Sequence, residues 1–254
     1  MPEHTTFITY LLSKFPALQH NAELIGYSFI GHHEPTWRSF EPICTALLVV
    51  LFVTILALRA RAKVSDLDSA VIPDDKLTVR TFMEAFVGFF YGIARDVMGP
   101  RRAKRYFPII GGSACFIFFS NLMALIPGFA PPTSSLNITL GCAVGVFIAF
   151  NYYGLQANGF GYIKHLAGPK WYLAWLVFPI EIISTCVRPI TLSIRLMVNM
   201  AVDHLLATIA IGLVGLFVPV PLMFLGAIVI VVQTLVFSLL TSIYIGLATE
   251  HEEH

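Results

Sequence analysis

Residues 181–204 carry polar and charged side chains inside sequence that is otherwise apolar. Seven of these residues recur at steps of three or four: Glu181, Ser184, Arg188, Thr191, Arg195, Asn199 and Asp203. Such steps place all seven along one face of a helix. An arginine does not lose its proton in a protein, and its charge near the middle of a bilayer costs about 2.5 to 3.5 kcal/mol. Arg195, which has no acidic residue one helical turn away, is therefore the first candidate for a functional role.

An interhelical hydrogen-bond seam is one explanation for this stripe, and it would account for Ser184, Thr191 and Asn199. It does not account for two arginines, a carboxylate at each end and His204, because charges at membrane depth need water or a partner. We therefore expect the stripe to line an ion path. Residues 222–248 add a smaller polar set, and their one amide, Gln233, could face the stripe; the other members are Thr234, Ser238, Thr241 and Ser242.

The composition is that of a membrane protein. Hydrophobic residues make up 57% of the chain and charged residues 12%, against about 25% charged residues in soluble domains. Three runs without Asp, Glu, Lys, Arg or His are close to the length that spans a bilayer, namely 42–58, 106–129 and 136–155. Two longer apolar stretches, 171–217 and 222–248, flank a break with two prolines. We predict an all-α polytopic protein with about five membrane helices, the last two long, strongly tilted and paired as a hairpin.

The basic residues predict the orientation of these helices. Ten of the sixteen Lys and Arg residues fall within 59–105, so the positive-inside rule makes this connection cytoplasmic. The N-terminus is then outside, with 1–41 as an outer extension, and the C-terminus is cytoplasmic. The connection contains an apolar stripe typical of an interfacial helix, which would be a surface connector or a docking element for another subunit: Phe82, Phe86, Phe89, Ile93 and Val97.

The predicted organisation is thus an extension, 1–41, and a membrane channel domain, 42–254. Within the domain, 171–248 is the hairpin that carries the channel residues. The four cysteines stand singly in predicted spans, so no disulfide or metal framework follows and we expect no cofactor.

Several stretches resemble subunit a of the membrane (Fo) sector of F-type ATP synthases. They are FPIEIIS at 178–184, RPITLSIRL at 188–196, Asn199-Met200, NLMALIP at 121–127 and Gln233. The resemblance extends from about residue 80 to 254. It implies that the hairpin lies against a rotating ring of c subunits, each with a membrane-embedded carboxylate, and that this subunit supplies two offset aqueous half-channels without a catalytic site of its own.

The resemblance also implies roles for individual residues. Arg195 would be the stator arginine, with Asn199 and Gln233 near it. Glu181 and Ser184 would lie on the cytoplasmic half-channel, His204 would hold the position of an outer-channel ionisable residue, and Arg188 would be secondary. The implied partners are the c-ring, peripheral-stalk b subunits, other ATP synthase subunits, the lipid bilayer and protons in preference to sodium, with no nucleic acid. The implied location is an energy-coupling membrane, the bacterial inner (plasma) membrane.

Physical chemistry agrees with a stator arginine. Burial favours the neutral form of a rotor carboxylate, whereas a nearby guanidinium favours the anion, so protons would leave on one side of Arg195 and enter on the other.

The chain departs from the common family pattern, which places a carboxylate at 204 and a histidine at 226. Here Asp203 and His204 are adjacent and Gly226 stands opposite. We interpret this as a relocation of the same acid and imidazole within one cavity, and expect Asp203 and His204 to form an outer proton relay.

Other classes of membrane protein fit less well. A secondary ion transporter would usually show an internal repeat, and none is convincing in this chain. A serine protease built on Ser113 and His204 lacks a supporting signature, and a b-type cytochrome would need histidine pairs in its spans. A non-catalytic membrane scaffold stays open as an alternative. It is distinguished by whether changing Arg195 alone abolishes ion movement.

Overall fold

The computed structural model describes residues 41–64, 78–126, 129–159, 171–214 and 219–249. The predicted outer extension lies almost wholly outside these ranges. Every long element within them is an α-helix: α3 (Glu41–Val64), α5 (Val79–Met98), α6 (Pro100–Leu122), α7 (Leu136–Asn158), α9 (Trp171–Val214) and α10 (Pro219–Ala248). Two short 3-10 helices, η2 (Met123–Leu125) and η3 (Pro132–Ser134), lie between α6 and α7. Of the described helices, five are long and apolar enough to cross a membrane, which confirms the predicted number.

Two helices begin earlier than the sequence predicted. The second span starts at Pro100 instead of residue 106, and the last starts at Pro219 instead of residue 222. Proline suits the first turn of a helix because its φ is already helical and its missing N–H would have had no partner there. The basic residues 101–105 are therefore the first turns of α6, not a loop. Gly99 and Gly159 follow α5 and α7 with positive φ, the conformation that glycine adopts most easily.

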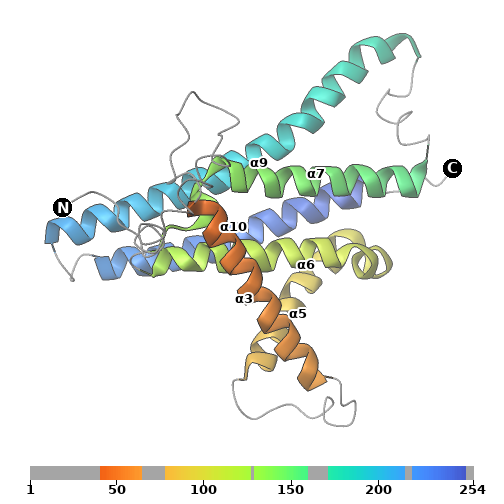
Figure 1. The fold of residues 1–254 in the computed structure, drawn as a ribbon. Helices are drawn as coiled ribbons and strands as arrows, with labels where there is room; N and C mark the ends of the chain where they lie inside the picture. Colours follow the sequence, from red (N-terminus) through yellow and green to blue (C-terminus); the bar gives the residue numbers. More distant parts are fainter. Residues whose placement is uncertain (1–40, 65–77, 127–128, 160–170, 215–218, 250–254) are drawn as a thin grey trace, which may run out of the picture.

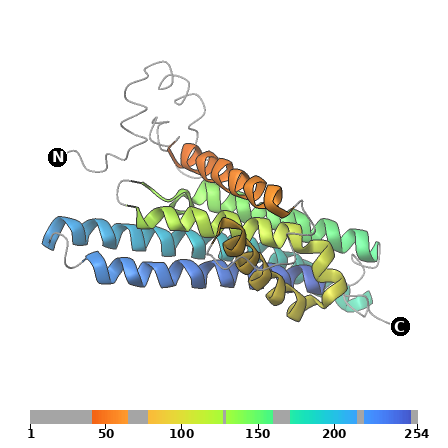
Figure 2. The same cartoon turned by 90° about the horizontal axis from the view of Figure 1, so that it is seen from below.

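The spanning helices α6, α7 and α10 lie side by side with the second half of α9, while α3 and α5 cover one side of this bundle (Figures 1 and 2). The first turns of α9 diverge from α7 and α10 (Figure 1). Their side chains are correspondingly open, with Trp175 85% exposed and Ile183 62% exposed. Tilt relative to a membrane and the division into domains stay predictions.

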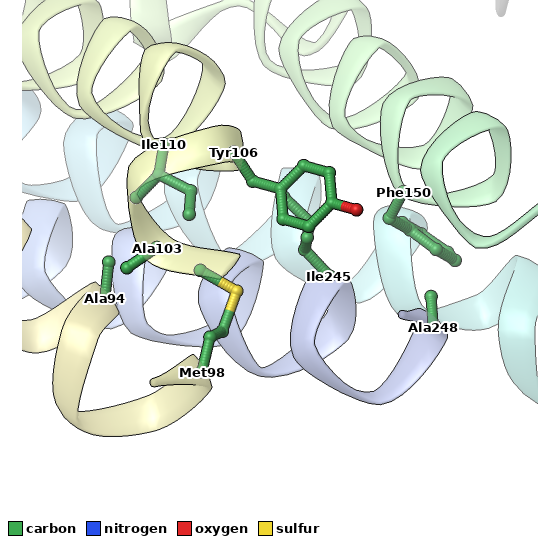
Figure 3. Packing of buried hydrophobic residues seen from close by; sticks show 8 residues of the cluster. All are labelled: Ala94, Met98, Ala103, Tyr106, Ile110, Phe150, Ile245 and Ala248. Atoms are coloured by element: carbon green, nitrogen blue, oxygen red, sulfur yellow. The ribbon is translucent and has the colours of Figure 1, made fainter. Parts of the chain in front are cut away.

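The carboxyl end of α10 is held firmly by three other helices. A core cluster joins them there (Figure 3): Ala94, Met98, Ala103, Tyr106, Ile110, Phe150, Ile245 and Ala248. Arg102 Nη1 donates to the carbonyl of Gly246 at 3.3 Å, and Asn158 Nδ2 donates to that of Ala248 at 3.3 Å. Carbonyls in the last turn of a helix lack intrahelical donors, so these side chains supply them from α6 and α7.

A second core cluster lies behind the polar stripe of α9, where α6, α7, α9 and α10 meet. Its members are Ile117, Val146, Leu192, Leu196, Met200, Ile230 and Phe237. This cluster turns the opposite face of α9 outward.

The helix predicted in the basic connection is confirmed as α5, and the predicted apolar stripe is largely separate from the face that packs against the bundle. The residues that pack against the bundle are Met83, Phe90, Ala94 and Met98. Phe82 and Phe89 of the predicted stripe are 40% and 53% exposed. An outward apolar stripe suits a helix at a lipid interface, and that placement stays a prediction.

Candidate functional site

The polar stripe lies on the outward face of α9, as its spacing predicted. Ser184, Thr191 and Arg195 are exposed, and the other stripe residues are partly exposed, as is His204. Leu192, Leu196 and Met200 on the other side of the helix are at most 3% exposed. Among the described residues, no side chain forms a hydrogen bond or an ion pair with Arg195. The guanidinium is therefore available to a group outside this part of the chain.

A recess of about 380 Å³ opens between α9 and α10 on the amino-terminal side of Arg195. We call it the arginine recess; it is lined by Ser184, Val187, Arg188, Thr191, Leu192, Arg195, Leu240 and Tyr244. Arg188 Cζ lies 5.2 Å from the centroid of the Tyr244 ring, and Arg188 Nη2 lies 3.9 Å from Glu181 Oε1. The recess can hold several water molecules beside the two arginines, since one water occupies about 30 Å³ in the liquid.

An amide bridge joins α9 to α10 one turn beyond Arg195. Asn199 Nδ2 donates to Gln233 Oε1 at 2.9 Å. Gln233 is 3% exposed, and its Nε2 has no hydrogen-bond partner among the described residues. The prediction that Gln233 faces the stripe is confirmed by this bond.

A second, smaller recess of about 40 Å³ lies beyond this bridge. We call it the acid recess; its lining includes Asp203, His204, Gly226, Ala124 and Leu125. Asp203 Oδ2 is buried without a hydrogen-bond partner in the described part of the chain. A Cβ added at Gly226 would meet only Leu125 Cδ2, at 3.8 Å. The expectation that Gly226 lies near Asp203 and His204 with room for a side chain therefore agrees with the structure.

Arg195 stands between these two recesses. At about 1.5 Å per residue, Asp203 lies about 12 Å beyond it along the helix axis, and Glu181 lies about 21 Å before it. The arrangement offers two hydrated or polar sites that are separated by a fixed positive charge. Chemically, it can bind ions, water and carboxylates on either side of that charge.

The remaining polar residues of α10 do not join the stripe. Thr234, Ser238, Thr241 and Ser242 are fully buried within the bundle. Thr234 and Ser242 donate to carbonyls of their own helix at 2.8 Å, as hydroxyls within apolar helices commonly do. Of the polar residues predicted on α10, Gln233 therefore lies at the site, and the four hydroxyl residues lie within the bundle.

Two residues near the site were not singled out from the sequence. Tyr244 lines the arginine recess, and its spacing of eleven residues from Gln233, three helical turns, is the signal that could have identified it. Asn121 entered only as part of a resembling stretch. It is fully buried, and its Oδ1 accepts a hydrogen bond of 2.6 Å from Thr133 Oγ1.

Comparison with known proteins places this chain in a family. The family described as ATP synthase A chain matches residues 42–246. "ATP synthase subunit a" of Sorangium cellulosum is 67% identical over 254 residues, which is 100% of both chains. "ATP synthase subunit a" of Aliarcobacter butzleri is 41% identical over 228 residues, covering 89% of this chain and 95% of the relative. "ATP synthase subunit a 1" of Syntrophotalea carbinolica is 36% identical over 244 residues, 96% of each chain.

Proposed function

The chain belongs to the family of subunit a of ATP synthase, and we propose that it is the stator ion-channel subunit of the complex. In this role it passes protons between two offset half-channels and the carboxylates of a c-ring, and so couples ion flow to rotation. ATP is made elsewhere in the complex. The observation that carries the proposal is the exposed Arg195 between two recesses, without a partner among the described residues.

The charge of Arg195 explains why a rotor carboxylate would pause in front of it. A guanidinium exposed at membrane depth needs an anion or water, and the described residues offer no anion to Arg195. A carboxylate carried past on a neighbouring ring would meet this need and would be stabilised as the anion while it does so. The same positive charge repels a proton that would otherwise pass directly from one recess to the other. Protons must therefore travel with the ring.

The arginine recess is proposed as the cytoplasmic half-channel. Its volume of about 380 Å³ admits a group of waters, and Ser184 and Thr191 offer hydroxyls along it. Glu181 lies at its rim, 3.9 Å from Arg188. Released protons would reach the cytoplasm through these waters, with Glu181 and Ser184 as exchange points.

The acid recess is proposed as part of the outer half-channel. Asp203 and His204 would pass protons to the ring there, with Asn199 and Gln233 between them and Arg195. An imidazole ordinarily titrates near pH 6.5, so it exchanges protons readily under physiological conditions. The buried Oδ2 of Asp203 gives this recess a free proton acceptor.

The chain is a multi-pass membrane protein, and its relatives are bacterial. We place it in the bacterial inner membrane with the basic connection, 59–105, in the cytoplasm and the N-terminus outside. The proposed partners are the c-ring and peripheral-stalk b subunits. Protons are the proposed ion.

The test of this function is Arg195→Ala in the assembled complex, measured in inverted membrane vesicles. We expect the subunit to stay in the membrane and ATP hydrolysis by the complex to persist, while ATP-driven proton pumping and ATP synthesis are lost. Arg188→Ala should do less harm, because Arg188 lies about two turns nearer than Arg195 to the proposed cytoplasmic end of α9, toward which a long side chain can extend to water. Near-normal pumping by Arg195→Ala would exclude the proposed role and leave the membrane scaffold as the better account.

A further inference from the structure

A pair of buried hydroxyls joins the back of α9 to α7, close to the depth of Arg195. Ser193 Oγ donates to Thr139 Oγ1 at 3.1 Å, and both residues are fully buried. Thr139 Oγ1 lies 3.2 Å from the carbonyl oxygens of Ser135 and Leu136, to which it donates its own proton. Ser193 precedes Arg195 by two residues, about 3 Å along the helix axis. A directional link to a neighbouring helix therefore exists at the level of the functional arginine.

The positions around the helix show what this link can control. At 3.6 residues per turn, Ser193 lies about 160° from Arg195, and Asn199 lies about 40° from it on the same side. The buried residues Leu192, Leu196 and Met200 fall between these two directions. The bond from Ser193 to α7 and the bond from Asn199 to α10 thus stand at the two edges of the buried face of α9.

Apolar packing alone does not fix the rotation of such a helix in a membrane. Lipid chains are as apolar as leucine, so turning a leucine from the bundle to the lipid costs little. A hydrogen bond is directional and is lost on rotation. A rotation of α9 by about 40° would point Arg195 in the direction that Asn199 now takes, toward α10. It would also point Thr191 in the direction that Arg195 now takes.

We propose that Thr139 and Ser193 are positioning residues, whose hydrogen bond sets the rotation of α9 and so directs Arg195 toward the rotor. The inference rests on the proposed function. It adds Ser193, on the side of α9 opposite the channel, and its partner Thr139 on α7. Neither residue touches the proton path. They affect transport by fixing the direction in which Arg195 points.

The first test is Thr139→Val in the whole complex. Valine keeps the shape of threonine and removes the acceptor for Ser193. We expect the ratio of protons pumped to ATP hydrolysed to fall by up to about threefold, the largest loss that the threefold shift in equilibrium from one interhelical hydrogen bond can cause. Thr45→Val is the matched control, because Thr45 is equally buried and, among the described residues, its hydroxyl bonds only to carbonyls of its own helix, those of Glu41 and Pro42. This control should pump like the parent.

The second test separates the bond from packing. Ser193→Ala should cause the same loss as Thr139→Val, and the two changes together should be no worse than either alone. Exchange of the two residues, Thr139→Ser with Ser193→Thr, keeps both hydroxyls and should restore pumping. If Thr139→Val fails to assemble, Ser193→Ala and the exchange carry the test. Additive losses, or an exchange that stays impaired, would overturn the positioning role.

The third test reads the rotation directly. Cysteines are introduced singly at Ile190, which is 46% exposed, and at Leu192, which is 3% exposed, after the native cysteines are replaced. A membrane-permeant maleimide should label the first much faster than the second, and Thr139→Val should reduce this contrast about threefold. An unchanged contrast, together with pumping equal to that of Thr45→Val, would overturn the inference. Pumping by Arg195→Ala would instead overturn the function on which it rests.

Discussion

The two recesses beside Arg195 differ greatly in size and in chemistry. The arginine recess measures about 380 Å³ and is lined by two arginines and three hydroxyls, whereas the acid recess measures about 40 Å³ and is lined by one carboxylate and one imidazole among apolar neighbours. A space of the first size holds a group of waters, and one of the second size holds one or two. If the proposed function holds, water would carry protons through the wide recess, whereas side chains would carry them through the narrow one.

The helices explain this difference in width. The first half of α9 diverges from α10 (Figure 1), and it contains Pro179 and Pro189, each of which removes an intrahelical hydrogen bond and favours a bend. The second half is drawn against α7 and α10 by Leu192, Leu196 and Met200 and by the bond from Asn199 to Gln233. The space between α9 and α10 is therefore wide beside the first half of α9 and narrow beside its second half.

The largest expected effect of this difference is in the acid recess. Asp203→Asn and His204→Ala should each reduce ATP-driven pumping and ATP synthesis by about tenfold, since few waters are present to replace a lost proton carrier. Adding Gly226→His to His204→Glu should recover part of the flux, because the space beside Gly226 accepts a side chain. The measurement is dye quenching in inverted vesicles across about pH 6 to 8, where an imidazole titrates. If both single variants transported at the parental rate, the proton relay of Asp203 and His204 would be excluded, and only the proposed role of Arg195 would stand.

Filling the recesses should sharpen the comparison, with the second-largest effect. Gly226→Leu places an apolar side chain in the narrow recess and should lower the flux several-fold. Val187→Leu adds one carbon to the lining of the wide recess and should leave the flux near the parental rate. Both variants are compared for flux per ATP hydrolysed, with the amount of subunit in the membrane as the control. Equal losses in the two would show that width does not decide how protons pass.

A smaller effect is expected at the rim of the arginine recess. Glu181→Gln should slow transport by less than Asp203→Asn does, because the wide recess that includes Arg188, the partner of Glu181, has room for waters that could replace this carboxylate as an exchange point. Cysteines at 181 and 184 should react with impermeant reagents applied from the cytoplasmic side. Labelling from the outer side alone would show that the subunit crosses the membrane in the opposite orientation to the one proposed.

The sequence predicted the functional face of α9 and two of its neighbours on α10, Gln233 and Gly226, and missed the features that depend on how closely the helices pack. Steps of three and four residues were sufficient to place Arg195, Asn199 and Asp203 on one face. Whether the apolar stripe of α5 meets lipid or another subunit was left open, because, in a membrane, such a stripe can face lipid as well as protein. The unequal widths of the recesses depend on how far α9 diverges from α10, which no local pattern encodes. The spacing of Tyr244 from Gln233 could place it on the same face of α10, but its contact with Arg188 depends on how the two helices pack.

The smallest effect is expected at Tyr244, and it tests how far the wide recess tolerates change. The ring lies 5.2 Å from the Arg188 guanidinium, a contact worth about 0.5 to 1 kcal/mol where water is present. Tyr244→Phe keeps the ring and should transport at the parental rate. Tyr244→Leu removes the ring and leaves Arg188 with its contact to Glu181, so that this arginine, about 10 Å from Arg195 along the axis, competes somewhat better for the rotor carboxylate. The loss of flux per ATP hydrolysed should then be at most about fivefold, the factor that corresponds to 1 kcal/mol. Equal losses in the two variants would assign the effect to the hydroxyl, and a loss as large as that of Asp203→Asn would show that the wide recess, too, relies on individual side chains.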